Sequence, residues 1–166
     1  MKKAGCLLLI PVLALAVVLC GGWPLAPMEV SELLPARVLL VERTGGTVMV
    51  SCGAATGSGA GLEQAMEDME RTAAGQLLLD TVEHVVLHAS AYALLDEAAQ
   101  STRLRPAARV YLGEGELPEA EKAEAYLRVH GGTVTLGTVR ASLLGAGEEQ
   151  PPHLLTREGR LYLIEQ

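Results

Sequence analysis

The sequence predicts a fold of the α/β (α+β) class. We expect a single domain with a mixed sheet of four to six strands and about three helices packed on it. Short β-branched, apolar runs alternate along the chain with segments whose apolar residues recur every three or four positions. The chain has 166 residues, of which 49% are hydrophobic, so it can form one domain with a real core. That core must be aliphatic, because the sequence has no Phe, one Trp and four Tyr.

The first 22 residues have the layout of a signal peptide or membrane anchor. Lys2 and Lys3 precede an unbroken apolar run from Cys6 to Cys20, and two glycines end it. The run is shorter than the about 20 residues that a membrane-spanning helix needs, but its flanks bring it near that length. Either way, the two lysines predict that the body of the protein lies outside the cytoplasm.

Three fates of this segment stay open. Cys20 could be the lipid attachment residue of a lipoprotein, although Leu19 stands where a small residue is preferred. Signal peptidase could cut at the small residues of Ala14-Leu15-Ala16. The helix could also stay uncleaved as an anchor.

Residues 23–35 form a Pro-rich spacer, because Pro24, Pro27 and Pro35 keep the chain extended and non-helical. The predicted domain covers residues 36–166. It opens with a β-hairpin, in which apolar strands at 36–43 and 47–52 flank a Gly-Gly turn. Residues 53–61 follow as a flexible, glycine-rich loop.

Residues 62–72 predict a helix, with Gly75 as its C-cap. Its buried face is expected to consist of Leu62, Ala65, Met66 and Met69.

Residues 80–89 alternate as a strand, and Ser90 is a candidate cap for a helix over 92–100. A second strand at 107–112 would complete a parallel strand–helix–strand crossover.

A third helix is expected from Pro118, at its first position, to about Arg128, where Gly131-Gly132 stops the pattern. Residues 133–144 fit a strand or a helix. A loop at 145–152 and a final strand at 159–164 end the domain.

The charge of the chain limits its partners. The formal net charge is −7, and without Lys2 and Lys3 the body carries 11 basic against 20 acidic residues. Nucleic-acid binding calls for a basic face, so no nucleic-acid partner is predicted. An acidic body also disfavours electrostatic docking onto anionic lipid headgroups.

The glycine-rich segment does not have the spacing of a nucleotide site. A dinucleotide fingerprint would need a third glycine where Leu62 stands, and a P-loop would need a lysine that the segment lacks. Cys52 is the only cysteine of the body, which leaves no internal disulfide or zinc cluster. We expect Cys52 to be a small packed residue.

The histidines of the 80–89 segment are expected to be structural. On a strand, His84 and His88 lie about 13 Å apart, too far for one metal ion. The sequence therefore predicts no catalytic residue, no cofactor and no metal site. A hydrolase would need His84 to converge with Asp80 or Glu83 in a deep pocket, and this interpretation stays open.

Several stretches resemble those of one known family in order and type. They are Cys20-Gly-Gly-Trp23, Glu29-Val-Ser-Glu-Leu33 before the first strand, the turn Thr44-Gly-Gly, the helix Leu62–Thr72, His84-Val-Val-Leu-His-Ala before a short helix, and Arg103–Pro106 before Arg109-Val-Tyr-Leu112. Over residues 29–112 the chain resembles the N-terminal domain of the Ger(x)C spore-germination lipoproteins, the C subunits of germinant receptors.

That resemblance implies a non-enzymatic, membrane-tethered protein on the outer face of the inner spore membrane. Its implied partners are the germinant-receptor membrane subunits, and its implied role is in spore germination. The alternative is a small extracytoplasmic ligand-binding or envelope-assembly domain with no role in germination.

Overall fold

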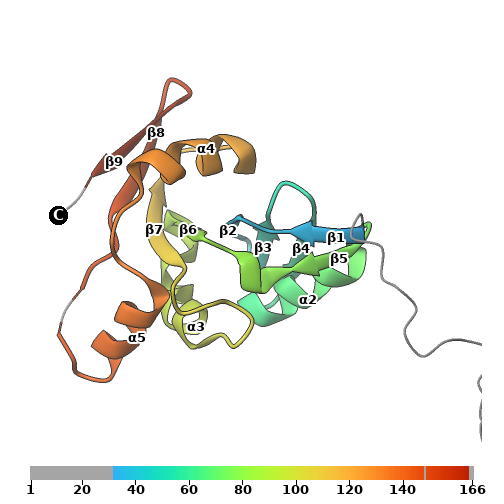
Figure 1. The fold of residues 1–166 in the computed structure, drawn as a ribbon, viewed down its shortest axis with the longest axis horizontal. Coiled ribbons are helices and arrows are strands. Elements are labelled where there is room, and N and C mark those ends of the chain that lie inside the picture. Colours follow the sequence, from blue (N-terminus) through green and yellow to red (C-terminus); the bar gives the residue numbers. More distant parts are fainter. Residues whose placement is uncertain (1–31, 148, 165–166) are drawn as a thin grey trace, which may run out of the picture. The chain divides into compact units, whose positions relative to one another are not determined.

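The computed structural model describes residues 32–147 and 149–164, and it confirms the α/β fold class. The predicted targeting segment, Cys20 and most of the spacer lie outside these residues. The strands of the main sheet form a seven-stranded mixed layer (Figure 1), larger than predicted. In spatial order they are β4 (Thr56–Gly59), β3 (Thr47–Ser51), β2 (Val38–Thr44), β6 (His84–His88), β7 (Arg109–Glu114), β8 (His153–Arg157) and β9 (Arg160–Ile164).

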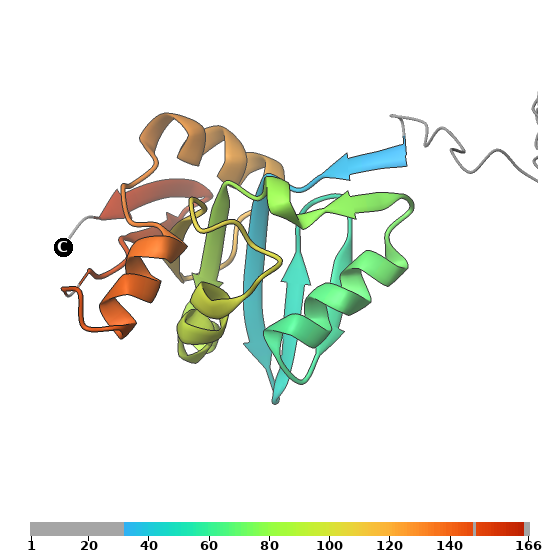
Figure 2. The ribbon, with the colours of Figure 1, turned by 60° about the horizontal axis from the view of Figure 1, so that its bottom comes forward.

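Within the described residues, four α-helices cover the two faces of this sheet unequally (Figure 2). Three of them contribute to a large aliphatic core on one face: α2 (Leu62–Thr72), α3 (Leu95–Gln100) and α5 (Leu136–Leu143). Helix α4 (Ala120–His130) packs on the opposite face, in a smaller cluster with residues of β2, β6, β7, β8 and β9. None of the helices within the described residues is long and apolar enough to cross a membrane.

The central strands confirm the predicted hairpin and crossover. Strands β2 and β3 pair antiparallel around a turn in which Gly45 and Gly46 both have positive φ. Strands β2, β6, β7 and β8 are parallel neighbours. Side chains of β6 alternate between the two faces of the sheet, as the pattern predicted. Val85 and Leu87 lie in the larger core, and Val86 lies in the smaller cluster with α4.

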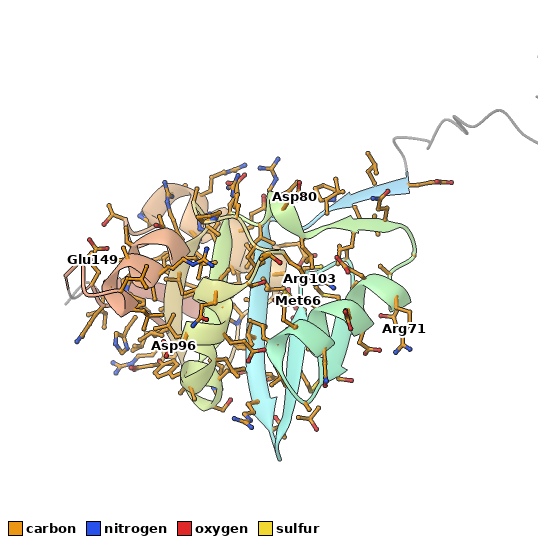
Figure 3. All side chains as sticks on the ribbon, turned by 90° about the horizontal axis from the view of Figure 1, so that it is seen from below. Met66, Arg71, Asp80, Asp96, Arg103 and Glu149 are labelled. Carbon is orange, nitrogen blue, oxygen red and sulfur yellow. The ribbon has the colours of Figure 1, made fainter. Side chains whose placement is uncertain are left out.

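The predicted face of α2 is confirmed, since Leu62, Ala65, Met66 and Met69 are all buried. Figure 3 shows Met66 directed from α2 toward the sheet, whereas Arg71 points away from it. The predicted C-cap at Gly75 is wrong, because the helix ends at Thr72 and its C-cap is Ala73. Gly75 instead packs so closely against the chain that an added Cβ would lie 2.4 Å from the Glu32 carbonyl oxygen.

The glycine-rich segment is not the flexible loop that was predicted. Residues 56–59 form the edge strand β4, on which α2 packs. A Cβ at Gly57 would lie 2.3 Å from the Ala65 carbonyl oxygen and the Met69 amide nitrogen, so the glycine permits this close approach.

Besides β4, three strands were not predicted. Strand β1 (Leu33–Pro35), at the end of the expected spacer, pairs in parallel with β5 (Gln76–Leu78) in a separate two-stranded sheet. The third is β8, which adds a neighbour to β7. Asp80 lies in a single turn of 3₁₀ helix, η2 (Leu79–Thr81), and not in the strand predicted over 80–89.

Helix starts differ from the predictions in two places, and a third helix settles a segment that was left open. The cap of the 3₁₀ helix η3 (Ala89–Leu94) is His88, whose ring accepts the Ser90 amide, and not Ser90 itself. Pro118 precedes α4 and is not its first residue, because the cap is Glu119. The ambiguous segment 133–144 contains helix α5, which begins at a capping box formed by Thr135 and Thr138.

Candidate interaction surface on the C-terminal hairpin

Strands β8 and β9 form an antiparallel hairpin at one end of the sheet. Successive side chains of a strand point to opposite faces, so the register determines which residues share a face. Three cross-strand pairs fall on one face: His153 with Ile164, Leu155 with Tyr162, and Arg157 with Arg160. We call this face the open hairpin face.

The other face of the hairpin is covered. Leu154 and Leu161 are buried there against the residues of α4, and Leu163 is partly buried beside them. Helix α4 therefore closes this side of the hairpin and supplies it with a core of its own.

Beyond His153 at its base, the open hairpin face has no comparable cover among the described residues. Tyr162 and Ile164 are each 46% exposed, and Leu155 is half-buried. A hollow of about 730 Å³ lies against this hairpin; its lining residues are Leu155, Arg157, Glu158, Tyr162, Leu163 and Ile164. An exposed apolar surface rimmed by charged residues is typical of an interaction site.

The tip of this face carries an unbalanced positive charge. Arg157 and Arg160 are directly opposite each other, both are exposed, and neither forms an ion pair with a residue of the described chain. Glu158, in the turn between them with φ 49°, forms no such pair either. Like charges directly opposite in a sheet are destabilising, so the folded hairpin offers a site for an anion.

The base and the edge of the hairpin are held in place. His153 Nδ1 lies 2.6 Å from Glu114 Oε1, and its ring meets that of Tyr92 edge-on at 6.4 Å. At the edge, the Leu163 amide donates to the Tyr126 hydroxyl and Lys122 donates to the Gly159 carbonyl oxygen. The open part of the hairpin is therefore its face.

The residues considered for a hydrolase do not converge. His84 is only 2% exposed, and its Nδ1 lies 3.2 Å from the Tyr111 hydroxyl. Glu83 pairs with Arg37 at 2.6 Å, and Asp80 is exposed in η2. Burial, with a smaller contribution from the Arg109 charge, lowers the pKa of His84 to about 4. Burial also raises the pKa of Tyr111 to about 12.

His88 and Ser90 form a hydrogen-bonded pair at the carboxyl end of β6. The His88 Nε2 lies 3.0 Å from the Gly115 carbonyl oxygen, which can only accept, so Nδ1 accepts the Ser90 hydroxyl at 2.8 Å. Ser90 Oγ also accepts the Arg43 amide at 3.0 Å. The pair thus joins β2, β6 and β7 to the start of η3.

Other candidate groups are accounted for by packing. Cys52 is buried, and its sulfur lies 3.7 Å from the Ala55 carbonyl oxygen. Within residues 32–147 and 149–164, no cluster of three or more His, Cys, Asp or Glu side chains could hold a metal ion. The candidate lipid attachment residue, Cys20, lies outside the described residues.

Sequence reasoning did not single out the open hairpin face. The strand at 159–164 was predicted, but its partner β8 was not, so the cross-strand pairs could not be assigned. The available signal was the Glu158-Gly159 turn with an arginine on each side.

No protein-family model, curated protein or solved structure matches the chain. The resemblance to the Ger(x)C lipoproteins therefore rests on the short stretches within residues 20–112. The open hairpin face lies beyond them and adds an independent argument about function.

Proposed function

We propose that the protein is a non-enzymatic, membrane-tethered, extracytoplasmic domain that acts through protein–protein contacts in spore germination. The observation that carries the interaction role is the open hairpin face. The tether is an inference from residues 1–22, and the germination role is an inference from the Ger(x)C resemblance.

The two faces of the β8–β9 hairpin differ in how their apolar side chains are covered. One face of the β8–β9 hairpin has a core with α4, whereas Tyr162 and Ile164 on the other face are half exposed to water. A rigid scaffold holds these side chains, because β8 is hydrogen-bonded to β7 of the central sheet. Such a preformed apolar surface can bind a partner without large rearrangement.

The non-enzymatic part of the proposal is supported by the Ser90 environment. Its hydroxyl joins Arg43 to His88, and both bonds serve the packing of strand ends. A fluorophosphonate probe should leave Ser90 unlabelled in the folded full-length chain. Stoichiometric labelling of Ser90, lost in His88→Gln, would contradict the proposal.

The interaction role is tested by photocrosslinking in the native membrane. A photoreactive phenylalanine analogue replaces Tyr162 in the full-length chain, and the matched control replaces Val129, which is 69% exposed on α4. We expect a discrete crosslinked protein adduct from position 162 that position 129 does not give, and loss of that adduct when Ile164→Asp is added. Equal crosslinking at both positions would overturn the assignment of the surface.

The germination role needs a test in the host. Deleting the gene should slow or abolish germination, and the Tyr162→Glu chain should fail to restore it. Unchanged germination in the deletion strain would remove that role and favour the envelope-assembly alternative, as would a gene neighbourhood without germinant-receptor membrane subunits.

The tether is tested separately by intact-mass analysis of the native membrane fraction. A diacylglyceryl mass on a chain that begins at Cys20 would identify a lipoprotein. A full-length mass would identify an uncleaved anchor, and a shorter unmodified chain in the soluble fraction would contradict the tether.

A further inference from the structure

We infer that the open hairpin face receives an amphipathic helix of a partner protein, with carboxylates that meet Arg157 and Arg160 and an apolar stripe that covers Tyr162. This inference rests on the proposed interaction function and adds the chemistry of the partner. Three features support it: the charge at the hairpin tip, the spacing of the cross-strand pairs, and the helices that cover the neighbouring strands.

The charge calls for an anionic partner group. Arg157 and Arg160 form a like-charge cross-strand pair, without an acidic partner among the described residues, in a chain whose net charge is −7. A carboxylate between them would replace repulsion with two attractive contacts. Guanidinium groups suit this role because their planar forks bind carboxylates bidentately.

The spacing of the pairs fits a helix that runs along the hairpin. From the arginine pair, the Leu155–Tyr162 pair is two residues away, about 7 Å, and the His153–Ile164 pair is four residues away, about 13 Å. Helical residues four and eight positions apart are separated by about 6 Å and 12 Å. A helix with a carboxylate at one position and apolar residues four and eight positions later would match all three pairs.

The surrounding elements favour a helix over an added strand. The larger core places α2, α3 and α5 on the same side of the sheet as the open hairpin face, so a partner helix there would extend an existing layer (Figure 2). Strand addition at β9 would have to displace the Tyr126 hydroxyl from the Leu163 amide and Lys122 from the Gly159 carbonyl oxygen. A helix on the open hairpin face would leave both of these hydrogen bonds intact.

An anionic lipid surface could also supply negative charge to the two arginines. The acidic body of the chain would be repelled by such a surface as a whole. A carboxylate on a partner helix meets the arginines locally and keeps the acidic residues of the domain in water. The observations therefore favour a protein partner.

The test measures binding of designed peptides to the full-length chain in neutral detergent. The probe is a synthetic amphipathic helix of about 18 residues, long enough to be helical. It carries Glu at one position and leucines four and eight positions later. The matched peptide has Lys at that position. Fluorescence anisotropy should show the Glu peptide binding about tenfold more tightly than the Lys peptide at low salt, with the preference falling as salt is added.

The variants test where the preference arises. The double substitution Arg157→Gln and Arg160→Gln should abolish the preference for the Glu peptide, and Tyr162→Ala should weaken binding of both peptides. Arg128→Gln, an exposed charge change on α4, is the control and should leave both affinities unchanged.

Three results would overturn the inference. The first is equal affinity for the two peptides, or no binding of either. The second is arginine-dependent binding to phosphatidylglycerol but not phosphatidylcholine vesicles, together with no peptide preference. The third is self-association of the chain through Tyr162. If the crosslinks from position 162 persist in the native membrane while the Glu peptide fails, only the partner chemistry is wrong. If the crosslinks fail as well, the proposed function is wrong.

Discussion

The backbone amide of Leu163 on β9 donates a hydrogen bond to the hydroxyl of Tyr126 on α4, with 3.0 Å between nitrogen and oxygen. Strand β9 is the last strand of the sheet, so its outward amides have no strand partner among the described residues. An uncapped edge of this apolar composition is a template for pairing with another chain. Tyr126 thus protects the edge and anchors the hairpin to α4.

Tyr126→Phe is expected to free this amide at little cost to packing. Deuterium exchange at Leu163 should accelerate markedly, and the free energy of unfolding should fall by about 1 kcal/mol, the net value of one hydrogen bond. Sedimentation should also show concentration-dependent self-association of the variant. Tyr162→Phe removes a hydroxyl from the open hairpin face and is the control; an equal rise in Leu163 exchange there would contradict the assignment.

His84 should make the protein less stable as the pH falls. Its pKa is about 4 in the folded chain, because of burial and then the Arg109 charge, against 6.5 in an unfolded one. Below pH 6.5 the unfolded chain takes up a proton that the folded chain does not, so stability falls by about 1.4 kcal/mol per pH unit until pH 4. Above pH 6.5 this effect vanishes.

The check is urea denaturation between pH 7 and pH 4. His84→Gln keeps a hydrogen-bonding group near Tyr111. Between pH 6.5 and pH 4, the free energy of unfolding of this variant should fall less steeply, by the contribution of one proton. NMR titration of the His84 ring provides a direct measurement. A midpoint near 6.5 in the folded protein would refute the prediction.

Gly57→Ala should be strongly destabilising because its new methyl group would meet backbone atoms of α2. The Cβ would lie 2.3 Å from both Ala65 O and Met69 N, and neither atom can move without shifting the helix. We expect the free energy of unfolding to fall by about 3 kcal/mol, measured by urea denaturation. Gly45→Ala is the matched control. Its Cβ would meet no described atom within 4 Å beyond the adjacent residues, so only the positive φ of +57° should lower stability, by about 1 kcal/mol. Similar losses in the two variants would contradict the close-packing argument.

The sequence predicted those parts of the fold in which local pattern and tertiary packing agree. The β2–β3 hairpin has a Gly-Gly turn, and α2 has a four-residue buried stripe, so periodicity alone located both. The parallel crossover from β6 to β7 followed from the order of a strand, a helix and a strand.

Other elements depend on contacts that a local pattern does not contain. Residues 56–59 look like a flexible loop because Gly57 and Gly59 carry no side chain, yet the missing side chains are what allow α2 to approach β4. The three residues of β1 form a strand only because β5 pairs with them. The open hairpin face depends on the β8–β9 register, so Arg157 and Arg160 could not be matched before β8 was known.

Arg103 connects the loop after α3 to α2, and its loss should destabilise the domain. Its guanidinium pairs with three glutamates of α2: Glu63 at 3.0 Å, Glu67 at 3.1 Å, and Glu70. Without Arg103 the three carboxylates would repel one another along the helix. We expect Arg103→Gln to lower the free energy of unfolding by about 1.5 kcal/mol at low salt, since a network exceeds an isolated surface pair.

The control for Arg103 is Arg71→Gln, which breaks a single pair between the exposed Arg71 and Asp68 of the same helix. We expect Arg71→Gln to lower the free energy of unfolding by less than about 0.5 kcal/mol. Urea denaturation in low salt and in 1 M NaCl separates the two contributions, because screening weakens the repulsion among the glutamates. The Arg103→Gln deficit should therefore shrink in high salt, while a deficit independent of salt would mean that Arg103 acts through packing of its aliphatic stem.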